Sequence, residues 1–323
     1  MIPEMAVSIA AEPTARINDH QVTGIAEVLR ALVGRERPTP AKWDDQRFWN
    51  VQSTIEDRCQ YLAIGNSINF RFWAQAHGKT VPAIGVIDGE ALRGSMYMWR
   101  RLRIAVDRGE LALDAPFLAN LDEETFSRAF ADDDGRLPLG AGIRERVLNL
   151  RDLGARLASK WDGQFVNVIR AANGSLKHFA DLCADFRAFD DPVQKLTMVN
   201  AIMLTGSGLV HFDQDPLPGI DYHLVKQALR QGLVTPSDRL RTKLTNHELL
   251  DEGESVALRT AILTTLIDVS HLAGISTAVI DNLYWLNRRI CGDEQWLCSS
   301  CPFEAGCAKR TEYGLPLELT RYY

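Results

Sequence analysis

Four of the six cysteines stand close together near the end of the chain, in the segment CGDEQWLCSSCPFEAGC. Four thiolates at this density suit a soft metal ion or an iron–sulfur cluster. A structural zinc site more often pairs two short C-x2–4-C knuckles, whereas one C-x2-C knuckle with longer arms can wrap a cuboidal cluster. The spacing therefore predicts a [4Fe–4S] cluster, with a zinc loop and four unliganded cysteines as the alternatives. Its ligands would be Cys291, Cys298, Cys301 and Cys307.

The composition sets limits on the rest of the molecule. Hydrophobic residues make up 46% and charged residues 24%, which is the balance of a soluble globular protein. The net charge of −6 lowers the expectation of a duplex-binding surface, since nucleic-acid-binding domains are usually basic. The sequence contains neither a signal-peptide pattern nor an apolar stretch long enough to span a membrane. Four cysteines grouped as metal ligands, with two isolated ones, fit a reducing compartment better than a disulfide framework, so we expect a cytoplasmic protein. We expect no membrane partner.

Apolar residues recur at helical spacing along most of the chain, and strand signals are few. We therefore predict a mainly α-helical fold, a bundle of short helices. The segment 58–73 is apolar and aromatic, and periodicity does not decide between helix and strand there. We expect a frayed terminus over 1–20, one helical domain or two intimate helical lobes over 21–290, and the cysteine loop and tail over 291–323. The helices are expected over 22–34, 95–109, 123–130, 143–161, 165–186 with a break at Asn173–Gly174, 193–206, 235–244, 255–274 and 276–290, and 216–233 is expected to be a hairpin leading into a helix. The expected N-caps are Thr235 or Ser237, and Ser255 and Ser276.

The cysteine loop resembles that of the endonuclease III group of helix-hairpin-helix DNA glycosylases. It shares their cysteine spacing and a preceding helix that ends LYWLNRRIC. In that group the cluster supports the fold and a loop facing the DNA backbone, and it does not cleave the bond. The resemblance implies a helix-hairpin-helix glycosylase-like bundle in which the cluster acts as a structural clasp.

The remaining sequence resembles the queuosine salvage proteins, N-glycosidases that release queuine from queuosine 5′-phosphate. The similar segments follow the family's order from about residue 58 to the end of the sequence. They are INFRFW (68–73), PLGAGIRERVLNLRDLG (138–154), GQFVNVIRAANGSLKHF (163–179), LPGIDYHLVKQALRQGLVTPSDRL (217–240), IDNLYW (280–285) and the ending GLPLELTRYY. The resemblance implies an N-glycosyl hydrolase that acts on a small nucleotide or nucleoside carrying a 7-deazaguanine-like base.

The same resemblance indicates the site residues. Asp221 matches the aspartate of the family's Asp-Tyr-Arg motif and is the candidate carboxylate that stabilises positive charge on the ribose or activates water. Its alternative role is to cap the helix that begins there. Lys195 is the second candidate: it would bind a phosphate or orient the carboxylate, or else be a solvated lysine on a helix surface. Asn69, Phe70, Phe72 and Trp73 are candidates for a stacking wall, and Tyr222 and His223 for further substrate contacts.

Other positions qualify the resemblance. Asp190, Asp191, Asp238 and Asp281 also align with acidic positions of the family; we expect Asp238 to cap a helix and Asp281 to anchor the helix before the cysteines. The family's Tyr-Trp pair is replaced by Ser95–Met96, and its Glu-x-x-Arg keeps only Arg259. These departures predict a divergent pocket.

Two other functions remain open. A DNA or RNA base glycosylase is suggested by the cysteine loop and its basic flanks, although nucleic acid is the less favoured partner. A nucleoside-binding or redox-sensing protein without catalysis is suggested by the altered motifs. The basic flanks are Arg288, Arg289, Lys309 and Arg310.

Overall fold

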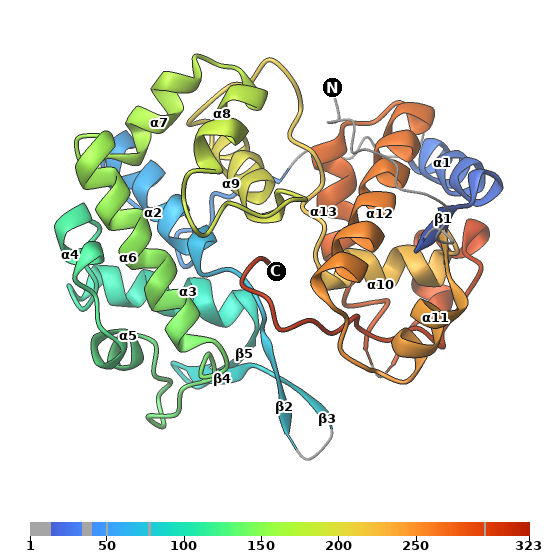
Figure 1. Cartoon of the computed structure of the whole chain (residues 1–323), viewed down its shortest axis with the longest axis horizontal. Coiled ribbons are helices and arrows are strands. Elements are labelled where there is room, and N and C mark those ends of the chain that lie inside the picture. Colours follow the sequence, from blue (N-terminus) through green and yellow to red (C-terminus); the bar gives the residue numbers. More distant parts are fainter. Residues whose placement is uncertain (1–13, 34–40, 50, 77–78, 294) are drawn as a thin grey trace.

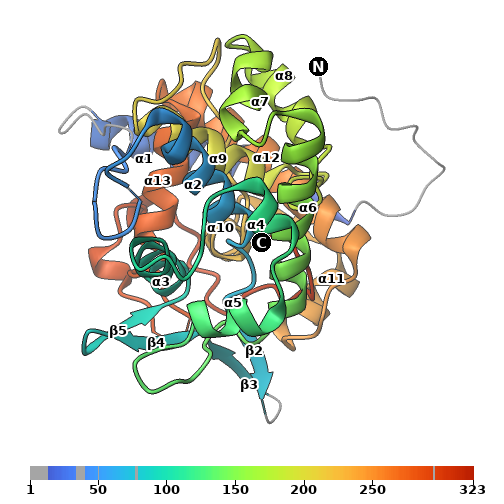
Figure 2. The ribbon, with the colours of Figure 1, turned by 90° about the vertical axis from the view of Figure 1, so that its left-hand side faces the viewer.

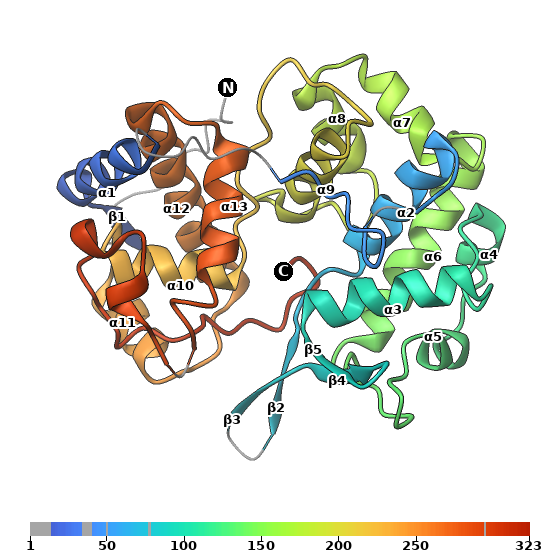
Figure 3. The same ribbon diagram turned by 180° about the vertical axis from the view of Figure 1, so that it is seen from behind.

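The apolar periodicity of the sequence produces a mainly α-helical protein with two hydrophobic cores. The computed structural model describes residues 14–33, 41–49, 51–76, 79–293 and 295–323. One core gathers side chains from between Phe48 and Phe212, and the other gathers side chains of α1 (Asp19–Val33), Val193 and the part of the chain from Ile220 to Tyr313. Figure 1 and Figure 3 show the two groups of helices side by side, from opposite directions. We call them the central lobe and the terminal lobe.

The central lobe is built around α2, whose second half is buried on all sides. Gly65 allows the close approach of α3, because a Cβ at this position would come within 2.1 Å of the Trp99 ring. Of the undecided segment 58–73, the first part is therefore a buried helix, and the strand β2 follows. The helices are α2 (Ile55–Ser67), α3 (Ser95–Asp107), α4 (Ala115–Ala119), α5 (Glu123–Ala129), α6 (Ile143–Lys160), α7 (Phe165–Ala172), α8 (Leu176–Cys183) and α9 (Lys195–Gly206).

The terminal lobe packs α1 and α10 against the long α12, with α13 leading to the cysteine loop. Its elements are α1 (Asp19–Val33), α10 (Tyr222–Gln231), α11 (Asp238–Thr245), α12 (Glu252–Ala273), α13 (Thr277–Asn287), η1 (Cys298–Ser300) and η2 (Glu304–Gly306).

The strands form three small antiparallel pairs. Two are hairpins at one edge of the central lobe. Figure 2 shows this lobe in front, with the two hairpins at the bottom. The third joins the start of the chain to the terminal lobe. The pairs are β2 (Trp73–Ala76) with β3 (Lys79–Pro82), β4 (Ile84–Ile87) with β5 (Glu90–Arg93), and β1 (Ala15–Ile17) with β6 (Val234–Pro236).

Local signals explain most helix boundaries. Asn173 and Gly174 both have positive φ and separate α7 from α8, as expected. Ser237 caps α11 through its side chain, as expected, so the cap is not Asp238, which is the first residue of the helix. The expected cap at Asp238 was therefore wrong, and so were two further expectations. Asp251, in a capping box with Glu254, begins α12, and Ser255 lies inside that helix.

The other of these two errors concerns the start of the chain. Residues 15–17 form β1, and α1 begins at Asp19, so the expected frayed terminus does not extend over them. Residues 1–13 lie outside the described part of the chain.

The helix α12 is long and apolar enough to cross a membrane by length and composition alone. Its packing gives it a different role, because it contacts α1, α10 and α13 in the terminal core. It also carries Arg259, whose side chain is 1% exposed and forms an ion pair inside the protein. These contacts are those of a core helix.

That ion pair joins the two lobes. Arg259 donates to both carboxylate oxygens of Asp191, each at 2.8 Å, and Asp191 lies just before α9 of the central lobe. Asp191 also accepts hydrogen bonds from the backbone N–H groups of Val193 and Lys195. A buried carboxylate with four donors is fully satisfied, so the pair fixes α9 against α12.

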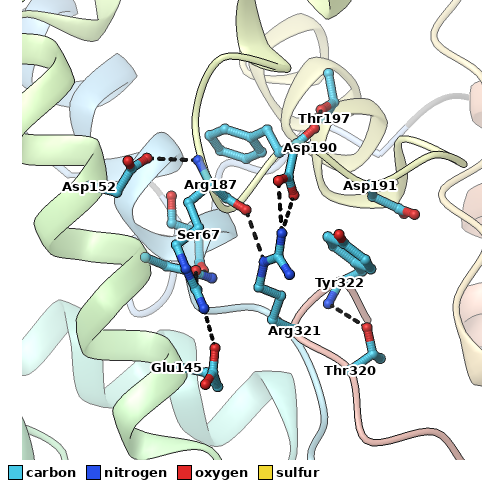
Figure 4. A network of polar contacts seen from close by, with 12 residues as sticks. Ser67, Glu145, Asp152, Arg187, Asp190, Asp191, Thr197, Thr320, Arg321 and Tyr322 are labelled. Atoms are coloured by element: carbon cyan, nitrogen blue, oxygen red, sulfur yellow. Dashed lines mark hydrogen bonds and ion pairs between the residues drawn. The ribbon is translucent and has the colours of Figure 1, made fainter. Parts of the chain in front are cut away.

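The last residues of the chain run between the lobes (Figure 1), and Figure 4 shows how Arg321 attaches them to the central lobe. Arg321 donates to both carboxylate oxygens of Asp190 at 2.7 Å, in the central lobe. On the other side, the hydroxyl of Tyr323 lies 2.7 Å from that of Ser255 on α12. The tail therefore closes the junction from one side.

Candidate active site

A cavity of about 1230 Å³ lies at the junction of the two lobes and is lined by both of them and by the tail. All eight residues proposed from the sequence for catalysis or substrate binding line this cavity, although they come from segments more than 150 residues apart. Their roles remain predictions, but their convergence in one cavity is a fact of the fold. They are Asn69, Phe70, Phe72, Trp73, Lys195, Asp221, Tyr222 and His223.

Asp221 is the N-cap of α10. Its Oδ1 accepts hydrogen bonds from the backbone N–H groups of His223 at 2.8 Å and Leu224 at 3.0 Å. The alternative interpretation as a helix cap is therefore correct, and it does not exclude a chemical role. Both of these hydrogen bonds use Oδ1, so Oδ2 is the oxygen available to a ligand in the cavity. The cap fixes the orientation of the carboxylate.

Lys195 is the first residue of α9 and is only 5% exposed, so the expectation of a solvated surface lysine is wrong. Its Nζ donates to the carbonyl oxygen of Asn69 at 2.8 Å. Burial lowers the pKa of Lys195 to about 8, while the nearby carboxylates of Asp221, Asp281 and Asp191 act in the opposite direction. Three acids around one ammonium favour the role of orienting and neutralising carboxylates over that of binding a phosphate.

Asp281, on α13, is a second acid in the same cavity. It is 8% exposed, and its Oδ1 accepts a hydrogen bond from the backbone N–H of Gly219 at 2.8 Å. Burial raises the pKa of Asp281 to about 7; the Gly219 bond and Lys195 oppose this rise, and the charge of Asp221 adds to it. The residue connects α13 to the loop before Asp221. The sequence interpretation of Asp281 as an anchor identified this structural contact but missed its place beside Asp221 and Lys195.

The loop 68–71 is held by its carbonyl groups. The fully buried Arg146 of α6 donates to Ile68 O at 3.2 Å, to Ala141 O at 2.8 Å and also to Phe70 O. Burial lowers the pKa of Arg146 to about 9, so it remains a cation at neutral pH. With Lys195 on Asn69 O, two cations from α6 and α9 fix three successive carbonyl groups. Sequence reasoning did not single out Arg146, whose position on a helix gives no sign of these partners.

The proposed stacking residues differ in their surroundings. Phe70 is fully buried beneath the Arg146 guanidinium, 4.4 Å from its ring centroid, and is therefore a core residue. Trp73 and Tyr222 pack with the tail residues Leu317 and Tyr323 in a third small apolar cluster.

Another group of aromatic residues in the cavity wall was not found from the sequence. Trp43 lies with its ring centroid 4.9 Å from that of Trp49 and 6.0 Å from that of Trp285. All three line the cavity. The indole N–H groups of Trp43 and Trp49 are buried without a hydrogen-bond partner in the described structure. Trp285 lies in the segment IDNLYW, which resembles a segment of the queuosine salvage family. The sequence gave no reason to place residues 43–49 beside it.

The cysteine loop follows α13 directly and forms another part of the cavity wall. Asp293, between the first two cysteines, lines the cavity and accepts hydrogen bonds from Arg93 of β5, at 2.6 Å, and from Lys226 of α10. Burial raises the pKa of Asp293, but the positive charges around it, of which Lys226 has the largest effect, hold that pKa below its usual range. The loop is thus attached to both lobes by one carboxylate.

The four cysteines of this loop are all partly exposed. Burial raises the pKa of the Cys301 and Cys307 thiols, and the charges of the other cysteines of the group act in the same direction. In the described residues no three His, Cys, Asp or Glu side chains converge as ligands of a metal ion. The structure therefore supports neither the zinc alternative nor the cluster, and the [4Fe–4S] assignment stays a prediction.

The basic residues beside the cysteine loop do not form a single surface. Arg288 and Arg289 line the cavity, whereas Lys309 donates to Glu304 at 2.9 Å. Two of the four basic residues proposed to contact nucleic acid therefore line the cavity between the lobes.

Comparison with known proteins finds similarity over part of the chain. Residues 49–200 match the family model described as queuosine salvage protein. A curated protein of Sphaerobacter thermophilus, named queuosine 5′-phosphate N-glycosylase/hydrolase, is 29% identical over 175 residues. The match covers 54% of this chain and 50% of that protein, so the chain spans about half the length of its curated relative. Both findings support the queuosine salvage resemblance. The family match includes Asn69 and Lys195 and ends before Asp221 and the cysteines.

Proposed function

We propose that this protein is an N-glycosidase that hydrolyses the bond between ribose and a modified, 7-deazaguanine-like base in a nucleotide or nucleoside. The observation that carries the proposal is the grouping of Asp221, Asp281 and Lys195 in one cavity large enough for a nucleotide. The family match and the curated relative support the same reaction class.

In the proposed mechanism, Asp221 stabilises the charge that develops on the ribose. The C1′–N bond breaks, its electron pair leaves with the base, and the positive charge on the ring is met by the carboxylate Oδ2. A water molecule then forms the new C1′–O bond and transfers a proton to the Asp221 carboxylate, which exchanges it with solvent after the reaction. Because the α10 N–H groups hold Oδ1, the carboxylate is oriented before the substrate arrives, and no reorganisation is needed during the reaction.

The departing base must gain a proton, and Asp281 is the group in the cavity suited to supply it. Its pKa of about 7 allows it to be protonated near neutral pH, whereas an ordinary aspartate would be ionised. Lys195 stays charged below about pH 8 and places a positive charge near both carboxylates. Two acids with different environments thus take the roles of charge stabiliser and proton donor.

The base is expected to differ from queuine or to be held differently. Ser95 and Met96, which replace the Tyr-Trp pair of the family pattern, both line the cavity. A smaller, more flexible pair at this position leaves more room beside the ligand, so related 7-deazapurine substrates belong in the test.

The experiment is to incubate the purified protein with queuosine 5′-phosphate, queuosine and related deazapurine nucleotides, and to measure base release by chromatography. Asp221→Asn is the matched control, because asparagine also caps helices well. We expect release by the wild type and a loss of about 10²–10³-fold or more in Asp221→Asn, as for removal of one electrostatic group from an active site. Failure of the wild type to release a base from any of these substrates would refute the proposal.

We also propose that Cys291, Cys298, Cys301 and Cys307 bind a [4Fe–4S] cluster in a helix-hairpin-helix glycosylase-like fold. The spacing of the four cysteines in one loop supports this assignment. Such a cluster would fix the loop that carries Asp293 and would take no part in bond cleavage. Anaerobic purification followed by visible spectroscopy and iron, sulfide and zinc analysis tests it; a colourless zinc protein would refute it. We retain a cytoplasmic location and a small-molecule partner as part of the proposal.

A further inference from the structure

Three buried asparagine side chains form a chain of hydrogen bonds behind the wall of the cavity. Asn66 on α2 and Asn200 on α9 are fully buried, and Asn69 lies in the cavity wall with 8% of its surface exposed. The Nδ2 of Asn69 donates to Asn66 Oδ1 at 3.3 Å, and the Nδ2 of Asn66 donates to Asn200 Oδ1 at 3.2 Å. The chain therefore joins α2, the loop 68–71 and α9, the helix that begins with Lys195.

The orientation of these amides is fixed by a main-chain carbonyl group. The Nδ2 of Asn66 also donates to Leu62 O at 3.0 Å, and it lies 3.4 Å from the sulfur of Met203. A carbonyl oxygen can only accept, so the side of the Asn66 amide that faces Leu62 is its NH2 group. The oxygen of Asn66 then faces Asn69, and only the NH2 group of Asn69 can bond to it. Turning either amide over would bring like groups together inside the protein.

Asn69 is held at three of its four polar groups. Its backbone N–H donates to Asn66 O at 3.2 Å, its NH2 group donates to Asn66 Oδ1, and its carbonyl oxygen accepts from Lys195 Nζ at 2.8 Å. The fourth group, Oδ1, receives no hydrogen bond from any residue that the structure describes. It is also absent from the buried polar atoms without a partner, so it is accessible at the cavity wall. The cavity therefore contains a free acceptor whose direction the protein has already fixed.

An amide oxygen in this position selects the chemistry of the group that binds to it. It pairs with an O–H or N–H donor and repels a group that can only accept, such as a keto or ether oxygen. Because Arg146 and Lys195 hold the loop 68–71, the oxygen cannot turn away from an unsuitable group. A site prepared for one hydrogen bond discriminates against a ligand that lacks the donor, since a polar group then stays unpaired.

We propose that Asn69 is a specificity-determining residue that accepts a hydrogen bond from an O–H or N–H group of the substrate, and that Asn66 is the positioning residue that fixes its accepting orientation. This inference rests on the proposed glycosidase function, because it takes the ligand of the cavity to be a nucleoside or nucleotide. Neither Asn66 nor Asn200 is among the described residues that line the cavity. Their effect on a substrate therefore passes through Asn69.

The test measures ligand binding by calorimetry in Asp221→Asn protein, so that cleavage does not interfere. Queuosine is compared with analogues that each lack donors of one kind: 2′-deoxyqueuosine, 3′-deoxyqueuosine, queuosine without the exocyclic amino group, queuosine methylated at the ring N–H, and 7-deazaguanosine, which lacks the side chain of the base. We expect one of these losses to weaken binding about 10-fold or more, because it leaves Asn69 Oδ1 unpaired. The analogue that shows the penalty identifies the donor as a ribose or a base group.

Two substitutions of Asn66 separate positioning from folding. Asn66→Leu removes the acceptor for the Asn69 NH2 group, so the Asn69 amide is free to turn, and the penalty for the missing donor should fall below about threefold. Asn66→Asp keeps an acceptor for Asn69 and should keep the penalty, although it also loses the bond to Leu62 O. Asn120→Leu is the matched control, because the exposed Asn120 also donates to a carbonyl four residues earlier, that of Pro116. It should leave every ratio of affinities unchanged.

Asn69→Leu gives the same readout if Asn66→Leu does not fold, because it removes the acceptor itself. A penalty that survives both leucine substitutions, equal weakening of all ligands by both, or no penalty for any analogue would overturn the inference. The two proposals fail separately. Donor-dependent binding by a protein whose wild type releases no base refutes only the hydrolase, and base release without a dependence of donor preference on Asn66 and Asn69 refutes only the present inference.

Discussion

Replacing Asp281 by asparagine should make the protein more stable and less active. Asp281 has a pKa of about 7 in the folded protein, against 3.8 for the ordinary group. The shift of about three pKa units corresponds to about 4 kcal/mol, at 1.36 kcal/mol per unit. The folded state binds the proton more tightly than the unfolded state, so this group reduces the free energy of unfolding progressively as the pH rises from about 4 to about 7. Asparagine removes that loss and keeps an oxygen for the Gly219 N–H.

The assay is urea unfolding of wild type and Asp281→Asn between pH 5 and pH 8. The stability advantage of Asp281→Asn should increase by about 2–3 kcal/mol over this interval, since part of the total shift is already present at pH 5. At each pH in this range, base release by Asp281→Asn should be slower than by the wild type, because asparagine cannot supply a proton. Asp215→Asn, at an exposed loop position, is the control and should follow the wild type. An advantage that does not change with pH would refute the reasoning that burial holds Asp281 protonated.

Three further predictions concern the other charged and sulfur-bearing groups. In the wild type kcat/KM should fall as the pH rises through about 7, where Asp281 loses its proton, and fall further through about 8, where Lys195 loses its proton. A pH–rate profile of Lys195→Arg should keep the first decline and lack the second. Arg146→Met should lower the free energy of unfolding in urea by about 2–6 kcal/mol, because two or more buried carbonyl oxygens lose their donors at about 1–3 kcal/mol each. A decrease below about 1 kcal/mol would contradict the role of Arg146 in holding the loop 68–71. Cys301→Ser should abolish visible absorption and lower Tm, whereas Cys59→Ala, in the central core, should retain the absorption. A chromophore that survives Cys301→Ser would exclude Cys301 as a ligand.

The helices were predictable because their signals are local. The break at Asn173–Gly174 needs only two residues that tolerate positive φ, and Ser237 caps α11 with a side chain three residues from its partner. The start of α12 was predictable in principle, since Asp251 and Glu254 form a capping-box pattern in the sequence. The pairing of β1 with β6 was not, because its two strands are more than 200 residues apart.

The site was only partly predictable for a similar reason. Motif order led to Asp221 and Lys195, which share the cavity as expected. The sequence could not show that Lys195 is buried, or that Asp281 lies close enough to affect it, because both depend on how α9 and α13 pack. Arg146 lies on a helix with an apolar stripe, and its carbonyl partners belong to a loop more than 70 residues away.

The Asp191–Arg259 ion pair has a consequence for how the protein unfolds. The two lobes have separate cores, which would permit two independent transitions. If one lobe opened alone, either Arg259 or Asp191 would remain in the other without its partner, at a cost of about 3–5 kcal/mol for a broken buried pair. This penalty makes partial opening costly and couples the lobes into one cooperative unit. The cavity between them is consequently protected against opening by the same interaction that connects α9 to α12.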